Sequence, residues 1–313
     1  MTSQTSTDVR AGASGGPTGT ARRPGAKAGG SVRRRRRLGD AAAHAFLTVL
    51  AVAWLVPIVW VLAESFNWNT APFTTTFFPT RYTLSNYTQL FTDTSVMNFP
   101  QMFLRTLVIA VFVCVIQLFF VLSVGFVMSR LRFRARRPLM NTALILGMFP
   151  GIMAVVAIYF ILKAMGLTGS STATTVALII VYSAGSGAGF YVMKGFMDTI
   201  PASMDEAALL DGCTRWTVFT RIILPITKPM MVYQALIGFL TPWLDFVMAK
   251  AIARTQENYT VSLGLWQMLQ KEYIAQWYAR FAAGAVLISI PIAVLFIVMQ
   301  RFYQSSMSGS VKG

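Results

Sequence analysis

The stretch MDEAALLDGCTRWTVFTRIILPITKP, residues 204 to 229, is a polar segment between two long apolar runs of the chain. Ser203, followed three residues later by Glu206, has the spacing of a capping box, so a helix is predicted to begin there. Gly212 can adopt the left-handed conformation that ends a helix without steric cost. The helix is therefore predicted to stop at about Asp211.

A second short helix is predicted directly after this turn. Thr214 can cap its start, and Pro225 disfavours helix at Leu224. Its apolar residues recur at helical spacing and form one stripe that can pack on a membrane bundle. The stripe consists of Trp216, Phe219, Ile222 and Ile223. Residues 203–225 are therefore predicted to form a helix–turn–helix on the cytoplasmic face, with the first helix open to another surface.

The rest of the chain is too apolar for a soluble domain. Hydrophobic residues make up 55% of it and charged residues 12%, and the mean hydropathy is +0.58. Six runs reach about the 20 residues that a helix needs to cross the hydrocarbon core. They lie at about 41–63, 104–128, 139–163, 173–197, 229–252 and 281–303. We predict an all-α membrane protein with six transmembrane helices and the helix–turn–helix between the fourth and the fifth.

The basic residues predict the orientation of these spans, because loops rich in Lys and Arg are retained in the cytoplasm. With the N-terminus inside, 20 of the 27 Lys and Arg residues fall on the inner side. Both termini are therefore predicted to be cytoplasmic. Residues 1–38, rich in Gly, Ser and Thr, are predicted to be a disordered basic tail. Its five adjacent arginines at 33–37 favour contact with anionic lipid over nucleic acid.

The sequence offers little for catalysis or metal binding. His44 is the single histidine, and Cys114 and Cys213 lack metal-ligand spacing, so neither a metal site nor a catalytic residue is predicted. The chain has no Gly-x-x-x-x-Gly-Lys-Ser/Thr phosphate loop. It is therefore not expected to hydrolyse ATP or to hold a cofactor of its own.

Asp245 is the one acidic residue deep within a predicted span, where an unpaired charge costs about 2.5 to 3.5 kcal/mol. It is expected to face the interior of the bundle or an outer vestibule. With Trp243 and Phe246 beside it, Asp245 could line a sugar path, because carboxylates and aromatic rings suit sugar hydroxyls. A structural hydrogen bond that holds the fifth span is the other interpretation.

The opening stretch closely resembles the EAA loop of the permease subunits of bacterial ABC importers. That loop reads Glu-Ala-Ala, three residues, Gly, and then Ile-x-Leu-Pro about ten positions later. The matching residues are Glu206, Ala207, Ala208, Gly212, Ile222, Leu224 and Pro225. In that family the loop docks as coupling helices into a cleft of the cytoplasmic ATPase. The resemblance implies the type I importer permease fold and a docking surface made of Glu206, Ala207, Ala208, Asp211 and Gly212.

The resemblance extends over nearly the whole chain from about residue 40. PWLDF at 242–246 and FAAGAVLISIPIAVLFIVMQRFYQSSMSGSVKG at the C-terminal end look like the second permease subunit of maltose and maltodextrin importers. Leu244 stands where many sugar permeases have Asn, so the exact sugar stays open. The resemblance implies import of a malto-oligosaccharide or a related sugar across the bacterial cytoplasmic membrane. The implied partners are a homologous second permease, two ATPase subunits that bind ATP and Mg²⁺, and an extracellular solute-binding protein.

Other interpretations stay open at this point. Residues 203–225 could be only an amphipathic interfacial linker. The chain could be an ion-coupled secondary sugar carrier, although such carriers are expected to show several ionisable residues in their spans. An intramembrane enzyme would need paired acids, and Asp245 has no second carboxylate in a span.

The resemblance also implies that residues 254–262 reach toward the binding protein and residues 309–313 toward the ATPase.

Overall fold

The computed structural model describes residues 29–72 and 76–307, and within these ranges the chain is helical, with only an isolated bridge between Asn67 and Tyr82. The α-helices are α1 Gly29–Glu64, α2 Ser85–Thr92, α3 Phe99–Arg130, α4 Arg136–Gly147, α5 Gly151–Ala164, α6 Ser171–Ala184, α7 Ser186–Asp198, α8 Ala202–Leu210, α9 Arg215–Thr217, α10 Leu224–Ile226, α11 Lys228–Leu244, α12 Val247–Ile252, α13 Val261–Met268 and α14 Ile274–Met307. A π-helix, η1, covers Val218–Ile223, and a 3₁₀ turn, η2, covers Gln256–Asn258.

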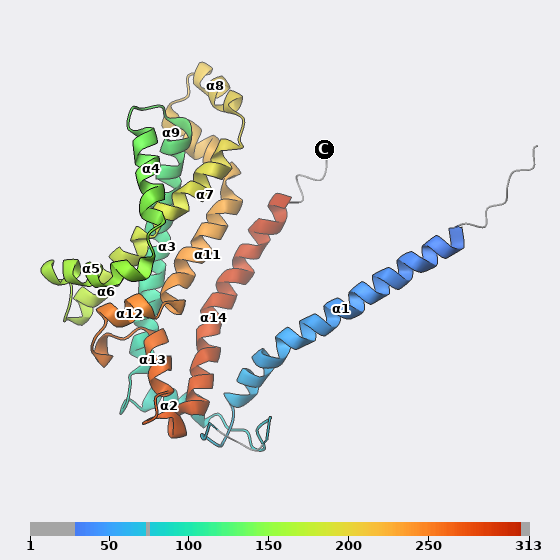
Figure 1. Ribbon diagram of the computed structural model, residues 1–313, viewed down its shortest axis with the longest axis vertical. Helices are drawn as coiled ribbons and strands as arrows, with labels where there is room; N and C mark the ends of the chain where they lie inside the picture. The colour runs from blue at the N-terminus through green and yellow to red at the C-terminus, as the bar shows by residue number, and fades with distance from the viewer. Residues whose placement is uncertain (1–28, 73–75, 308–313) are drawn as a thin grey trace, which may run out of the picture. The chain divides into compact units, whose positions relative to one another are not determined.

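The helix α3 lies at the centre of the bundle and packs against α6, α7 and α11. In Figure 1 the helix α8 lies beyond one end of this bundle, and α2 lies beyond the opposite end. Residues 254–262, expected near a partner protein, include η2 and follow α12 directly. Residues 309–313 and residues 1–28 lie outside the described residues.

Within the described ranges, four helices are long and apolar enough to cross a membrane. These are Gly39–Ser65, Phe99–Arg130, Ser171–Asp198 and Ile274–Gln300. Two bent pairs pass the same test together, Arg136–Gly147 with Gly151–Ala164 and Arg215–Ile226 with Lys228–Leu244. The number of candidate spans is therefore between four and six, and the all-α prediction is confirmed for the described part of the chain.

Two of the predicted spans are not continuous helices. The run at 139–163 bends by 101° between α4 and α5, where Pro150 and the glycines around it interrupt the hydrogen-bond ladder. The run at 229–252 stops at Leu244, and Asp245 takes an extended conformation before α12 begins. In contrast, residues 29–38, predicted as part of the disordered tail, form the first turns of α1. Arginine has a high helix propensity, so a run of arginines can continue a helix that the apolar span begins.

The helices α3 and α11 pack closely along a seam at Gly238. A Cβ atom added at Gly238 of α11 would lie 3.2 Å from Cα of Cys114 and 3.0 Å from Oε1 of Gln117, both on α3. A residue without a side chain therefore allows the two backbones to approach, as is common where membrane helices pack. The seam leaves no room for a larger residue at position 238.

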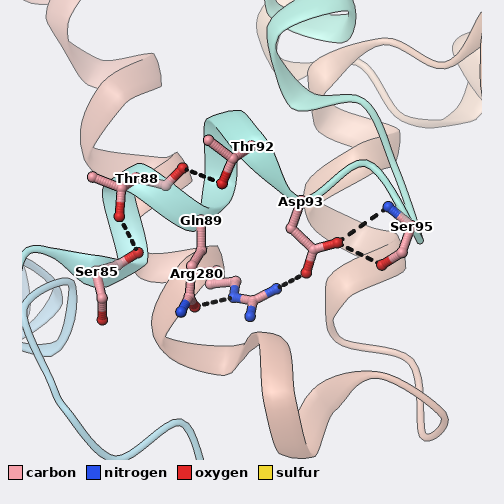
Figure 2. A network of polar contacts seen from close by, with 7 residues as sticks. All are labelled: Ser85, Thr88, Gln89, Thr92, Asp93, Ser95 and Arg280. Atoms are coloured by element: carbon pink, nitrogen blue, oxygen red, sulfur yellow. Dashed lines mark hydrogen bonds and ion pairs between the residues drawn. The ribbon is translucent and has the colours of Figure 1, made fainter.

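A polar network ties α2 to α14 at the end of the bundle opposite α8 (Figure 2). The Arg280 guanidinium donates to Oε1 of Gln89 at 3.1 Å and to Oδ2 of Asp93 at 2.6 Å. The other oxygen of Asp93 accepts from the hydroxyl of Ser95 at 2.5 Å and from its backbone N–H at 3.1 Å. These hydrogen bonds from Ser95, and then the Arg280 guanidinium, hold the pKa of the Asp93 carboxyl below its usual value, although partial burial acts in the opposite direction.

Asp93→Asn is expected to lower the stability of the folded chain at pH 7 and to matter less in acid. The folded-state pKa lies below the unfolded one, so the contribution is complete above about pH 4 and is lost as the pH falls through the folded value. Because the pair is partly exposed, the loss at pH 7 should be at most about 1 kcal/mol. Thermal unfolding in detergent at pH 7 and pH 3.5, with Glu272→Gln as the control, measures this. An equal Tm difference at both pH values would contradict the prediction.

Candidate functional site

The helix α8 begins two residues earlier than the predicted capping box requires, because that box has Ser203 at the N-cap position. Its first residue is Ala202, Pro201 stands at the N-cap position, and no side chain caps the first turn. The predicted capping box of Ser203 and Glu206 is therefore wrong. A proline can precede a helix start because its fixed φ suits that position. Asp205, the residue before Glu206, forms an ion pair with Arg130 of α3.

The predicted end of this helix is confirmed. Gly212 has a φ of +83°, a left-handed conformation that favours glycine. Its N–H donates to the carbonyl of Leu209 at 3.1 Å, and the N–H of Cys213 donates to the carbonyl of Ala208 at 2.9 Å. This pair of bonds is a Schellman motif, which satisfies carbonyls that the helix end leaves free. The turn after α8 therefore has a fixed geometry.

The second half of the segment is helical but differs in kind from the prediction. Thr214 caps it as expected, by accepting a hydrogen bond from the N–H of Thr217 at 3.2 Å. The π-helix η1 then follows, and α10 continues the helix through Leu224, which the sequence predicted to be disfavoured. The predicted stripe packs as expected at Phe219 and Ile223, whereas the Trp216 side chain is 70% exposed.

The five residues implied for ATPase docking lie together on α8 and its turn. Glu206, Ala207, Asp211 and Gly212 are exposed, whereas Ala208 is buried against the bundle. Four apolar side chains, one of them from the predicted stripe, are also exposed on this segment. They are Met204, Leu209, Leu210 and Trp216, with Leu210 as much as 87% exposed. A patch of this kind next to charged residues is typical of a protein–protein contact.

A cavity of about 650 Å³ lies between α3, α5, α6, α7, α11 and α12. Its walls are mostly apolar and include a few polar side chains, as in many ligand sites. The polar lining residues are Gln117, Tyr182, Tyr233, Gln234, Thr241 and Asp245, and the apolar ones include Ile152, Val155, Ile237, Val247 and Met248.

Asp245 lies on this cavity, at the break between α11 and α12. Its Oδ2 accepts hydrogen bonds from the Tyr182 hydroxyl at 2.9 Å and from the backbone N–H of Ala249 at 2.9 Å. Its backbone carbonyl accepts from the Ser262 hydroxyl at 2.7 Å. The carboxylate therefore joins α6, α11 and the start of α12. Its second oxygen, Oδ1, makes no hydrogen bond to the described residues.

Trp243 and Phe246 do not line the cavity with Asp245. Trp243 is 3% exposed and packs against Phe103 and Phe239, with ring centroids 5.3 and 6.0 Å away. Phe246 packs against Trp266 at 5.3 Å. Neighbours in the sequence thus face different parts of the bundle.

Two glutamines that the sequence reading did not single out form a polar layer beside the cavity. Gln117 donates to the carbonyl of Tyr182 at 2.7 Å, close to the junction of α6 and α7, and Gln234 donates to Oε1 of Gln117 at 3.3 Å. Both glutamines are buried. A polar amide inside an apolar run is costly unless it finds a partner. That cost is the sequence signal that could have identified them.

Comparisons with known proteins identify the family of this chain. Residues 121–308 match the family described as binding-protein-dependent transport system inner membrane component. The chain is 34% identical over 272 residues to the galactooligosaccharides transport system permease protein GanQ of Bacillus subtilis, covering 86% of this chain and 94% of that protein. It is 33% identical over 280 residues to the maltodextrin transport system permease protein MdxG of the same organism, covering 89% of this chain and 98% of that protein.

The fold also has a counterpart among solved structures. A chain in the crystal structure of a bacterial ABC transporter involved in the import of the acidic polysaccharide alginate superposes with a TM-score of 0.70 at 19% identity. The match covers 86% of this chain and 98% of that one. The family that the Glu-Ala-Ala stretch predicted is thereby confirmed: this chain belongs to the binding-protein-dependent transport system inner membrane components.

Proposed function

We propose that this chain is a permease subunit of an ATP-driven importer that moves an oligosaccharide, delivered by an extracellular solute-binding protein, into the bacterial cell. The observation that carries the proposal is the family membership together with the exposed α8 and its fixed turn at Gly212. A segment with an ordered end and an exposed mixed surface is suited to dock on another protein.

The docking surface consists of Glu206, Ala207, Ala208, Asp211 and Gly212, and its partner is a cytoplasmic ATPase. Ala208 would support this surface from the side of the bundle, because its side chain is buried there. Two ATPase copies would serve the complex, one under this chain and one under a homologous second permease. ATP and Mg²⁺ would be bound by those subunits, since this chain has no phosphate loop.

The chain would cross the membrane six times, with the two bent helix pairs each counted as one span and both termini in the cytoplasm. Five arginines between 130 and 137 lie near the end of the bundle that carries α8. Basic residues at that end support a cytoplasmic location for α8. The opposite end, which carries α2, would face the solute-binding protein, and the exposed residues 254–257 would also reach toward it.

The cavity beside Asp245 would form this chain's share of the sugar path. Its volume suits one or a few sugar rings, and its polar side chains offer both donors and acceptors to hydroxyl groups. Trp243 and Phe246 would act only indirectly, by holding the helix break at Asp245 in place. Two similar permeases carry names that refer to galactooligosaccharides and maltodextrin, which supports an oligosaccharide as the cargo.

The test is uptake into proteoliposomes that contain the chain with a candidate second permease, the ATPase and the binding protein. Labelled maltotriose and galactotriose should accumulate when ATP is enclosed and no ion gradient is present. Without ATP, a sodium or proton gradient should give no uptake. Uptake that follows the gradient and ignores ATP would replace the proposal with the ion-coupled carrier.

A further inference from the structure

An ion pair joins α8 to the end of α3. Nε of Arg130, the last residue of α3, lies 2.9 Å from Oδ2 of Asp205 in α8, and the two side chains are only 11% and 13% exposed. Nη2 of Arg130 also donates to the carbonyl of Ile200 at 3.0 Å, in the link between α7 and α8. One guanidinium therefore holds both the helix α8 and the link that leads into it.

The residue before Arg130 makes a neighbouring contact. The Ser129 hydroxyl donates to Oδ1 of Asp198, the last residue of α7, at 2.6 Å. Lys194 of α7 pairs with the same carboxylate. The end of α3 thus contacts α7 and α8 at the point where one leads into the other. Of these contacts, the pair of Arg130 and Asp205 is the one that reaches α8 itself.

The helix α3 connects this contact to the cavity. Gln117, which lines the cavity and donates to the carbonyl of Tyr182, belongs to the same uninterrupted helix as Arg130. At a rise of 1.5 Å per residue, the two positions are separated by about 20 Å along the axis. A displacement of α8 can therefore reach the wall of the cavity through a single rigid element.

We propose that Arg130 and Asp205 are positioning residues that transmit the movement of α8 to the cavity through α3. Without the pair, α8 would be connected to the bundle mainly through the chain segments on either side of it and through apolar contacts such as that of Ala208, and less of its movement would reach α3. Because the pair is largely buried, salt screens it less than an exposed one. The inference rests on the proposed function, since α8 has a movement to transmit only if it docks on an ATPase.

The test uses the full complex in proteoliposomes with Arg130→Glu, Asp205→Arg and the double exchange of the two charges. Arg132→Glu is the matched control, because Arg132 lines a surface cleft together with Arg130 and Asp205 but has no ion pair among the described residues. Each single variant should retain ATPase co-purification within about twofold but lower the sugar transported per ATP hydrolysed by at least about tenfold. The double exchange should restore that ratio to within about threefold of the wild type, and the control should leave it unchanged.

Two results would overturn the proposal. One is a ratio of sugar to ATP that stays at the wild-type value in the single variants, which would mean that the pair only stabilises the fold. The other is a double exchange that fails to restore the ratio although the complex assembles.

A measurement that needs no transport separates this inference from the proposed function. Hydrogen exchange of the amides of residues 202–210 should be faster in both single variants than in Arg132→Glu, and slow again in the double exchange. Unchanged exchange would overturn the inference even if the complex imports no sugar. Absence of ATP-dependent uptake by the wild type, with the exchange pattern as expected, would reject only the proposed function.

Discussion

Changing Glu206 to Lys and Gly212 to Pro together is expected to abolish both ATPase binding and ATP-dependent uptake. Gly212 has a φ of +83°, whereas the proline ring holds φ near about −65°, so the turn after α8 could not form. The first change also reverses a charge on the exposed face of α8. With the shape and the charge of the docking surface both altered, ATPase co-purification should fall by at least about tenfold, and uptake with it.

The matched control carries the same two types of change elsewhere. Gly166 also has a positive φ, +72°, in the turn after α5, and Glu272 is exposed in the turn before α14. Glu272→Lys with Gly166→Pro should therefore insert and keep its ATPase. If the docking variant binds the ATPase as well as this control does, residues 203–225 are only an interfacial linker.

Asp245→Ala is expected to reduce uptake to background, because it removes the acceptor for two hydrogen bonds at once. The Tyr182 hydroxyl and the N–H of Ala249 would both lose their partner. A buried polar group left without a partner costs about 1 to 3 kcal/mol. The start of α12 should loosen, and the wall of the cavity with it. Uptake and the yield of monodisperse complex would be measured together.

Asp245→Asn separates the structural role from contact with sugar. The amide oxygen can accept both hydrogen bonds, so assembly should be retained. In asparagine an NH₂ group replaces the second oxygen, which makes no hydrogen bond to the described residues. This NH₂ group donates hydrogen bonds and cannot accept one from a sugar hydroxyl. A hydrogen bond to a charged group is worth about 1.5 to 3 kcal/mol, so the KM for uptake should rise by roughly tenfold or more. An unchanged KM would make Asp245 purely structural.

The features that the sequence predicted well depend on a few adjacent residues. The helix end at Gly212 and the cap at Thr214 follow from the backbone preferences of single residues, and both occur. The predicted capping box at Ser203 was wrong because Pro201 takes the N-cap position two residues earlier, which leaves Ser203 within the first turn of the helix.

The features that the sequence could not predict depend on contacts between distant segments. Asp245 stood out as an acid within a span, but its partners Tyr182 and Ser262 come from other elements. Trp243 was grouped with Asp245 because the two are close in sequence, yet α11 ends between them at Leu244 and Asp245 is extended, so their side chains face different parts of the bundle. Gln117 and Gln234 form a polar layer only because α3 and α11 pack together, and the sequence does not show that packing.

The close seam at Gly238 determines how this permease could be adapted to a bulkier cargo. A larger side chain at position 238 would press on Cα of Cys114 and on Gln117, which lines the cavity, so variants selected from a random library should seldom change there. Ile152, Val155 and Met248 lie outside this seam and line the cavity directly. We therefore expect a selection for growth on longer oligosaccharides to enrich variants from a library directed at those three positions.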